Sequence, residues 1–435
     1  MAIKRNSFVV AALAAFTALA GCTTAQTGDE PAAQGKSTGT GTNAPAPGAR
    51  APSGEWEASV QLPGGDISFR MAFARDSGTL TAHILNSVER VPVRKVTEDG
   101  HRFSFQMLAF NSRIDAVLEG GVLVGTLTLV KRGGKKQVMP FRAVRAEGLQ
   151  HRISPVPGPD MTGRWDVTFR EDDGASTKAI GEFVQKEQTV TGTFLTPTGD
   201  YRYLKGTISG GQFALSCFDG AHAFLFKGKL DDTGVINGDF WSGTQWHESW
   251  TAVRDETITL PDPESLTYLR EGFDSFHFGF ASTSGTLVSS TDERFVGKVV
   301  VVTLAGSWCP NCHDEAAFLS DLYNAHQDRG LEAVGLMFEH YRDFATASLQ
   351  IERFREKHRI QYPLLVAGYS DKGEAGRALP MLNHVMSFPT MIILDRKGDV
   401  RRIHTGFSGP GTGEHYEAFK REFTEFIETL LAEGQ

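Results

Sequence analysis

Cysteine is scarce in this sequence, with four in 435 residues, at Cys22, Cys217, Cys309 and Cys312. So few cysteines exclude a scaffold held together by many disulfides. A zinc site built on the closely spaced pair Cys309 and Cys312 would need further ligands, and Cys217 has no paired motif near it. We therefore expect no metal and no cofactor.

Long hydrophobic runs and an excess of positive charge are also lacking. Beyond the N-terminus no apolar run approaches the roughly 18 residues that a transmembrane helix needs. The formal net charge of −8 argues against a nucleic-acid partner. The composition, with 40% hydrophobic and 22% charged residues, allows ordinary globular cores. The length suggests about three domains.

The first 21 residues have the composition of a bacterial lipoprotein signal peptide. A basic start is followed by the apolar segment 8–20, which ends in Leu19-Ala20-Gly21-Cys22 and resembles a lipobox. This resemblance implies that residues 1–21 are removed and that Cys22 is acylated and anchors the protein to a lipid membrane. The alternative is a plain cleaved signal peptide followed by a free cysteine.

Residues 22–53 predict a flexible tether. They are mostly Thr, Ala, Gly, Pro, Ser and Gln, and such a composition cannot bury enough apolar surface to fold. Thr23 rather than an aspartate follows the cysteine, so no inner-membrane retention signal is evident. We expect the periplasmic face of a bacterial membrane, with the outer membrane favoured.

An internal repeat divides the next 200 or so residues into two modules, 54–150 and 160–256. Gly54-Glu55-Trp56-Glu57 matches Gly163-Arg164-Trp165-Asp166, and Phe141-Arg142-Ala143-Val144-Arg145 matches Trp250-Thr251-Ala252-Val253-Arg254. Both matches have an offset of 109 positions, from 56 to 165 and from 145 to 254. Equal offsets at both ends indicate a duplicated unit.

The sequence pattern of each module predicts antiparallel β structure. Apolar and polar residues alternate along both copies, and glycine-rich turns recur between the alternating segments. About eight short strands per copy predict a small barrel or sandwich. Cys217 is in phase with Phe213 and Leu215, which predicts a buried and inert core thiol. No convergent polar cluster stands out, so the modules act as a spacer or docking unit, or alternatively bind a ligand.

The pattern changes in the last part of the chain, residues 265–435. Buried strands at 299–304 and 331–338 alternate with amphipathic helices, and a hairpin signal at 395–399 precedes a closing helix over 414–432. Alternating strands and helices followed by a hairpin predict a three-layer α/β domain.

Two cysteines follow the first of these strands. The turn after Val299–Leu304 delivers Cys309 to the start of a predicted helix, where unpaired N–H groups favour a negative charge. A thiolate there is a nucleophile, and Cys312 one turn later can attack a mixed disulfide and release the product. A static disulfide is the alternative to this redox pair.

These motifs together resemble a family. The Trp308-Cys309-Pro310-Asn311-Cys312 motif, the Gly297-Lys298 approach to a valine run, Glu315 and Phe388-Pro389-Thr390 resemble TlpA/ResA-like thiol–disulfide oxidoreductases over residues 265–435. The resemblance implies a thioredoxin fold with a catalytic Cys309–Cys312 dithiol. The expected fold is therefore two tandem all-β modules followed by an α/β thioredoxin-like domain.

The resemblance also assigns a substrate-binding edge. It implies a cis Pro389 facing the cysteines, so that the backbone of Phe388 can pair with a bound polypeptide, with Thr390 continuing into the next strand. An ordinary trans proline is the alternative. Trp308 is expected to cover the disulfide, or only to pack.

Glu315 lies three residues after Cys312, so the two side chains can meet on one helix face. Its carboxylate can then take or return the proton of the buried thiol, although a first-turn acid that stabilises the helix dipole is the alternative. His313 and Asp314 are expected to be exposed. Thr303 stands roughly where thioredoxin has a buried acid, which removes that proton route.

The sequence therefore predicts a lipid-anchored thiol–disulfide oxidoreductase that reduces, less readily oxidises, disulfides of envelope proteins. Because the compartment is oxidising, a membrane-spanning thiol reductase is the expected electron donor. Two alternatives stay open. One is a peroxiredoxin-like peroxidase with Cys312 as the reactive cysteine, and the other is a binding lipoprotein whose β repeats carry the main role. The unusual Pro310-Asn311 dipeptide leaves the direction of electron flow open.

Overall fold

The computed structural model describes residues 51–146, 156 and 158–433. The expected signal peptide, the lipidation candidate Cys22 and almost all of the tether lie outside the described residues. Among the residues that are described, no helix combines the length and the apolar character that crossing a membrane requires.

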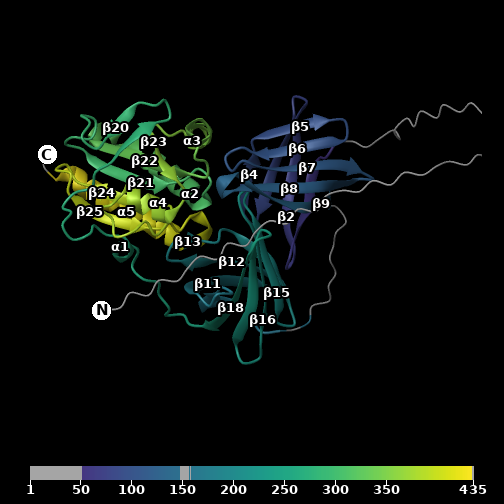
Figure 1. Ribbon diagram of the computed structural model, residues 1–435. Coiled ribbons are helices and arrows are strands. Elements are labelled where there is room, and N and C mark those ends of the chain that lie inside the picture. The colour runs from purple at the N-terminus through teal and green to yellow at the C-terminus, as the bar shows by residue number, and fades with distance from the viewer. Residues whose placement is uncertain (1–50, 147–155, 157, 434–435) are drawn as a thin grey trace, which may run out of the picture. The chain divides into compact units, whose positions relative to one another are not determined.

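The first module is an antiparallel sheet, coloured purple to blue in Figure 1. Within the described residues it has nine strands in the order β4-β3-β2-β1-β9-β8-β7-β6-β5. Their bounds are β1 Gly54–Leu62, β2 Gly65–Asp76, β3 Thr79–Asn86, β4 Glu89–Val93, β5 Lys95–Asp99, β6 Arg102–Met107, β7 Ser112–Glu119, β8 Val122–Lys131 and β9 Lys135–Arg145, with a 3₁₀ turn Arg132–Gly134. Every second residue of β1, from Trp56 to Leu62, is buried, as the two-residue period requires.

The second module closes into a barrel because β11 pairs with both β10 and β12. Its described strands are β10 Gly163–Arg170, β11 Ser176–Lys186, β12 Thr189–Thr196, β13 Gly199–Asp200, β14 Leu204–Ser209, β15 Gln212–Phe218, β16 Ala223–Leu230, β17 Val235–Ser242 and β18 Trp246–Arg254. Aromatic side chains fill its interior, where Phe226 stacks on Phe240 with ring centroids 4.3 Å apart. Cys217 is buried in the same core, as predicted.

The matched ends of the repeat are partners in the folded modules. Trp56 stands opposite Arg145 in the β1–β9 pair, and Trp165 stands opposite Arg254 in the β10–β18 pair. In each module the guanidinium lies over the indole, at 5.7 Å and 4.5 Å from the ring centroid. The same Trp–Arg cross-strand contact therefore occurs in both copies, with each residue shifted by 109 positions. The prediction of two antiparallel β modules is confirmed, with nine described strands per copy rather than about eight.

The C-terminal domain is a mixed α/β sheet with the order β20-β19-β23-β22-β21-β24-β25 in the described residues. Its strands are β19 Gly279–Ser282, β20 Leu287–Ser289, β21 Val299–Ala305, β22 Leu331–Glu339, β23 Leu364–Tyr369, β24 Thr390–Leu394 and β25 Val400–Thr405. Its helices are α1 Pro263–Leu266, α2 Pro310–His326, α3 Phe344–His358, α4 Lys372–Ala378 and α5 Glu414–Ala432, with 3₁₀ turns Gln327–Arg329 and Pro410–Thr412. This is the predicted thioredoxin-like domain.

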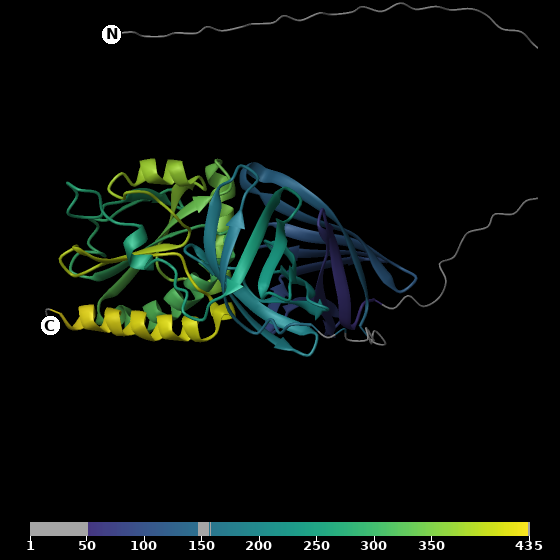
Figure 2. The ribbon, with the colours of Figure 1, turned by 90° about the horizontal axis from the view of Figure 1, so that it is seen from below.

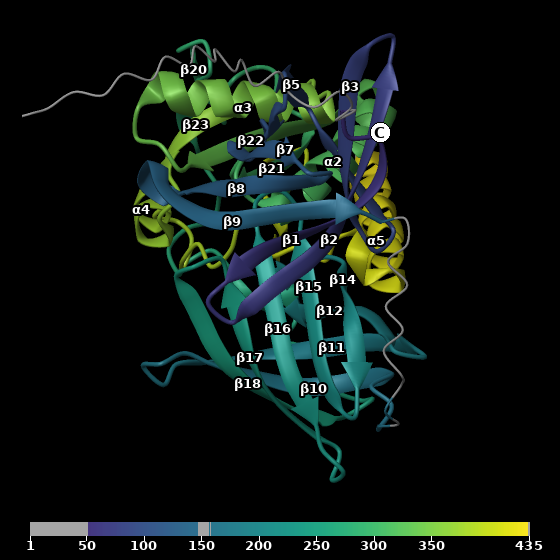
Figure 3. The ribbon, with the colours of Figure 1, turned by 90° about the vertical axis from the view of Figure 1, so that its right-hand side faces the viewer.

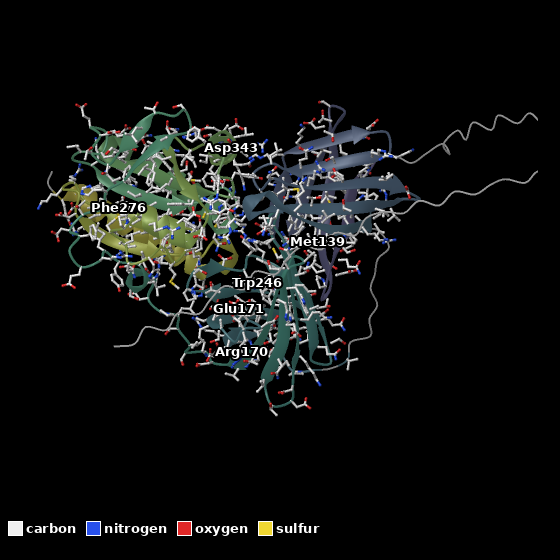
Figure 4. The ribbon with its side chains drawn as sticks, in the orientation of Figure 1. Met139, Arg170, Glu171, Trp246, Phe276 and Asp343 are labelled. Carbon is white, nitrogen blue, oxygen red and sulfur yellow. The ribbon has the colours of Figure 1, made fainter. Side chains whose placement is uncertain are left out.

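Helices cover both faces of this sheet. Phe318 of α2 packs on Phe419 and Phe423 of α5, so these two helices share one face. Figures 2 and 3 show α4 on the opposite side from α5. The three parallel strands β21, β22 and β23 between them are apolar along almost their whole length because both of their faces are covered. Phe276, labelled in Figure 4, belongs to the core of this domain.

The stacked aromatic core of the second barrel makes a stability prediction. Replacing Phe226 by alanine removes a fully buried ring and leaves a cavity, so we expect about 3–5 kcal/mol of destabilisation of this module in urea unfolding. The control is Trp246→Ala, because Trp246 belongs to the same barrel but is 46% exposed (Figure 4). Similar losses for the two variants would contradict the assignment of the barrel interior.

Candidate active site

Cys309 is placed at the N-terminus of α2 by the strand and turn that precede it. It is the N-cap residue of the helix, and its sulfur accepts a hydrogen bond from the backbone N–H of Cys312 at 3.3 Å. Pro310 follows at the first helical position, where its missing N–H costs no hydrogen bond. The two cysteine side chains are not joined by a disulfide in this structure. The helix N-terminus therefore points its free N–H groups at one sulfur.

The two cysteines differ in burial. Cys309 retains 6% of its surface, whereas Cys312 has none. Burial raises the pKa of the Cys312 thiol well above its usual range, and the neighbouring Cys309 and Glu315 add to the increase. Cys312 is therefore held as a neutral thiol, and Cys309 is the more accessible of the two.

Glu315 lies inside the domain, beneath the cysteines. It is 1% exposed, and the hydroxyl of Thr303 lies 2.9 Å and 2.8 Å from its two carboxyl oxygens. Burial raises the pKa of Glu315 to about 8, although the Thr303 hydrogen bond acts in the opposite direction. The alternative of a first-turn acid that serves the helix dipole is wrong, because this side chain faces the core. The hydroxyl of Thr303 holds this carboxyl group in place.

The loop before β24 faces the dithiol. The Phe388–Pro389 peptide bond is cis, and the Cys309 thiol lies 3.4 Å from the carbonyl oxygen of Phe388. Thr390 is buried and donates its hydroxyl hydrogen bond to the carbonyl of Ser387 at 2.9 Å. The structure therefore brings Phe388 next to Cys309, and Pro389 and Thr390 follow Phe388 in the chain. Their role in binding a substrate stays a prediction.

Trp308 is anchored against the end of β22. Its indole N–H donates to the carbonyl of Phe338 at 2.8 Å, and its ring stacks on His340 with centroids 4.4 Å apart. Beside it, the backbone N–H and the hydroxyl of Ser307 donate to the Glu339 carboxylate at 2.9 Å and 2.7 Å. Burial raises the pKa of Glu339 to about 7. Sequence reasoning did not single out Glu339, whose only signal is an acid at the end of a buried strand.

His313 is buried, not exposed as predicted. Only 3% of its surface is accessible, and its ring lies between Phe110 of the first module and Phe354 of α3, with both centroids 4.6 Å away. Burial and the nearby Lys357 lower the pKa of His313 well below its usual range, so the imidazole is neutral. The prediction failed because it could not include the module that covers this face of α2.

Asp314 is also covered, contrary to expectation. It forms an ion pair with Arg202, which follows the β12–β13 hairpin of the second module. Arg202 is itself nearly buried and forms a second ion pair with Glu89 of the first module at 2.6 Å. A polar cluster thus joins both modules to α2. Sequence reasoning found no such cluster, because its members are more than 100 positions apart.

Comparison with known proteins agrees with this geometry. The AhpC/TSA family matches residues 276–403. The thiol-disulfide oxidoreductase ResA of Geobacillus thermodenitrificans is 26% identical over 131 residues, which are 30% of this chain and 67% of the relative. The thioredoxin-like protein YneN of Bacillus subtilis is 28% identical over 138 residues, which are 32% of this chain and 73% of that protein. The C-terminal region of the chain is therefore similar to ResA, and we call it the ResA-like domain.

Solved structures also match this ResA-like domain. One is a putative thiol:disulfide interchange protein DsbE from Chlorobium tepidum, with 20% identity, a TM-score of 0.29, and coverage of 38% of this chain and 100% of that chain. The predictions of a TlpA/ResA-like domain and of a thiol–disulfide oxidoreductase are confirmed at the level of this domain. Among the described residues, no group of three or more histidine, cysteine, aspartate or glutamate side chains is arranged to hold a metal ion.

The raised pKa of Glu315 predicts a pH-dependent stability. The folded state holds this proton up to about pH 8, whereas the unfolded chain releases it near the ordinary value of 4.5. The stabilisation is therefore complete below pH 4.5 and is lost as the pH rises toward 8. Relative to Glu315→Gln, the reduced wild type should lose about 5 kcal/mol of unfolding free energy across this window.

Urea unfolding of the reduced proteins at the two ends of the window measures this difference. The exposed Glu422, changed to glutamine, is the control and should follow the wild-type pH profile. Parallel profiles for the wild type and Glu315→Gln would contradict a buried carboxyl that is neutral at low pH.

Proposed function

We propose that this protein is an extracytoplasmic, membrane-anchored oxidoreductase that reduces disulfides of envelope proteins through Cys309 and Cys312. The observation that carries the proposal is the sulfur of Cys309, which sits at a helix N-terminus against the cis-Pro389 loop. The ResA-like relatives support the same chemistry for the C-terminal domain. The location, the substrates and the partners are part of the proposal.

The reaction is a two-electron exchange. The thiolate of Cys309 attacks one sulfur of a substrate disulfide, forms a mixed disulfide and expels the other substrate sulfur as a thiolate. Cys312 then loses its proton and attacks the sulfur of Cys309, which releases the second substrate thiolate. The substrate gains two electrons, and the protein ends with a Cys309–Cys312 disulfide.

Glu315 is the proposed acceptor for the proton of Cys312. The thiol is neutral at rest and must be deprotonated before it can attack, and the carboxyl group of Glu315 lies close enough to raise the pKa of this thiol. A pKa of about 8 suits a group that takes and returns a proton near neutral pH. The hydroxyl of Thr303 fixes the carboxyl group in place for this transfer.

Binding of the substrate is assigned to the edge formed by Trp308, Phe388, Pro389 and Thr390. In this proposal the backbone of Phe388 pairs with an extended segment of the substrate and presents its disulfide to Cys309. Electrons come from a membrane-spanning thiol reductase, because an oxidising compartment does not keep the dithiol reduced. Acylated Cys22 holds the protein at the membrane surface, and neither nucleic acid nor a cofactor takes part.

Reduction of insulin disulfides, with dithiothreitol as electron donor, tests the activity. Cys309→Ser should reduce turnover to the uncatalysed rate, because it removes the attacking sulfur. Cys217→Ser is the control: Cys217 is also buried but lies in the second barrel, and this variant should keep the wild-type rate. Equal turnover by the wild type and Cys309→Ser would refute the proposal.

The order of attack has its own test. Cys312→Ser should accumulate a stable mixed disulfide between Cys309 and a substrate protein, because the resolving sulfur is missing. Non-reducing electrophoresis with mass spectrometry of the linked peptides identifies the cysteine involved. A complex trapped by Cys309→Ser instead, through Cys312, would reverse the roles of the two residues.

A peroxidase is the first alternative, and the match of residues 276–403 to the AhpC/TSA family supports it. A peroxidase of this kind would use Cys312 as the reactive cysteine, with Cys309 three positions before it. The complete burial and raised pKa of Cys312 argue against a thiolate that meets peroxide there. Peroxide consumption that depends on Cys312 would favour this alternative.

The second alternative is a binding lipoprotein in which the β modules carry the main role. A cavity of about 430 Å³ lies between the two modules, and its lining includes the charged residues Glu57, Arg70, Glu89, Arg90 and Lys205. Charges of both signs line it, so no single ligand class is favoured. The redox site is therefore the better supported function.

The proposed anchor gives a separate prediction. Expressed in a bacterium, the wild type should incorporate labelled palmitate and sediment with membranes. Cys22→Ser should lose both properties, because the acylated sulfur is absent. Membrane association of Cys22→Ser equal to that of the wild type would contradict a lipid anchor at this position.

A further inference from the structure

The β12–β13 hairpin of the second module lies directly against the dithiol. The carbonyl of Thr198 accepts a hydrogen bond from the hydroxyl of Ser387 at 3.0 Å, two residues before the proline of the cis bond. The carbonyl of Asp200 accepts one from the side-chain amide of Asn311 at 3.5 Å, between the two cysteines. The hairpin therefore contacts both the cis-proline loop and the cysteine motif.

A third segment of the C-terminal domain completes this contact. The carboxylate of Asp200 accepts a hydrogen bond from the backbone N–H of Gly409 at 2.7 Å. The backbone around Pro197 and Thr198 approaches Gly406 so closely that a β-carbon there would lie 2.9 Å from the carbonyl oxygen of Pro197. The hairpin thus fills the space beside Pro389, whose own carbonyl already accepts a hydrogen bond from Gly406 at 3.0 Å.

Gly199 at the tip shows how tight this fit is. Its φ of +145° is one that other residues rarely adopt, and a β-carbon at this position would collide with the side-chain amide of Asn311. A side chain at position 199 therefore cannot fit against Asn311 unless one of the two moves.

Arg202 holds the hairpin in place from its C-terminal side. It pairs with Asp314 on α2 and with Glu89 of the first module, and Asp219 lies 3.9 Å from its Nε. All four side chains are largely shielded from water, so the ion pairs are screened little by solvent. Removing one partner from such a cluster leaves an unpaired buried charge and weakens the contact.

We propose that the β12–β13 hairpin determines which disulfides reach Cys309. It occupies the edge on which an extended polypeptide would lie, so a protein substrate must displace it, whereas a small disulfide needs less space. This inference rests on the proposed function and adds a specificity element supplied by the second module. The opening of the hairpin, biased by the Arg202 ion pairs, sets the fraction of molecules able to react with proteins.

Gly199→Leu in the full-length protein tests this inference, because a side chain there must push the hairpin off Asn311. The pre-reduced protein is mixed with excess insulin or with hydroxyethyl disulfide, and oxidation of the dithiol is followed by acid quench and mass spectrometry. We expect the reaction with insulin to become about tenfold faster, and the reaction with hydroxyethyl disulfide to change much less.

The matched control is Gly234→Leu. Gly234 belongs to another turn of the same barrel, also has a positive φ, of +83°, and has open space where a side chain would begin. A side chain at this position is therefore also strained, but the variant should react at the wild-type rates. Circular dichroism checks that both variants are folded.

A second variant keeps the test decisive if Gly199→Leu does not fold. Asp314→Asn removes the charge that pairs with Arg202 and leaves the hairpin sequence intact, so it should also speed the reaction with insulin. Asp321→Asn makes the same change on the exposed side of the same helix and should have no effect. A rise in alkylation of Cys309 by a maleimide carrying a polyethylene glycol chain should accompany the faster reaction.

The outcomes separate this inference from the proposed function. If Cys309→Ser abolishes turnover but Gly199→Leu and Asp314→Asn react with insulin no faster than the wild type, the hairpin does not limit access and the inference fails alone. A slower reaction of these variants with insulin would also overturn it, since the hairpin would then help to bind the substrate. Wild-type turnover by Cys309→Ser would remove the proposed function itself.

Discussion

The hydrogen bond from the backbone of Cys312 to the sulfur of Cys309 is the interaction on which the site depends. It exists because a buried strand, β21, ends at Ala305 and the chain turns into α2 with Cys309 at the N-cap. The first N–H groups of a helix have no partner within the helix, so a sulfur at this position satisfies one of them. The same geometry places the second cysteine one turn inside the domain, away from water.

Burial then raises the pKa of the acidic groups around the dithiol. Cys312 and Glu315 are both surrounded by apolar side chains, so each holds its proton more tightly than it would in water. A proton can pass between two such groups without a charge being transferred to solvent. Glu339, below Trp308, is buried in the same way but is hydrogen-bonded to Ser307 rather than to the cysteines. The domain thus holds two carboxyl groups with raised pKa values near one dithiol.

The β modules pack against residues around the dithiol. Phe110 of the first module packs on His313, and the hairpin of the second module contacts Asn311 and Ser387. Several of these contacts use backbone groups or a glycine, which makes them dependent on the shape of the chain rather than on one side chain. A spacer needs no such fit. The fit is the reason for treating the second module as part of the redox site.

Local patterns in the sequence were enough to predict antiparallel β structure in both modules, the duplicated unit and the cysteine pair. Period-two alternation and apolar runs depend only on neighbouring residues, and the Trp–Arg offset of 109 reflects one cross-strand contact in each copy. The position of Cys309 before a helix followed from the strand and turn that precede it. The cis bond at Pro389 was expected from the family resemblance and not from the local pattern.

The surroundings of the dithiol were decided only by tertiary structure. Nothing local distinguishes His313 and Asp314 from exposed residues in a first turn, because their burial comes from segments far away in the chain. Arg202 reaches α2, and Glu89 reaches Arg202, only when the two modules and the C-terminal domain pack together. A sequence records which residues are apolar and how they alternate, but it does not record which surfaces meet. That depends on shape and charge complementarity between whole domains.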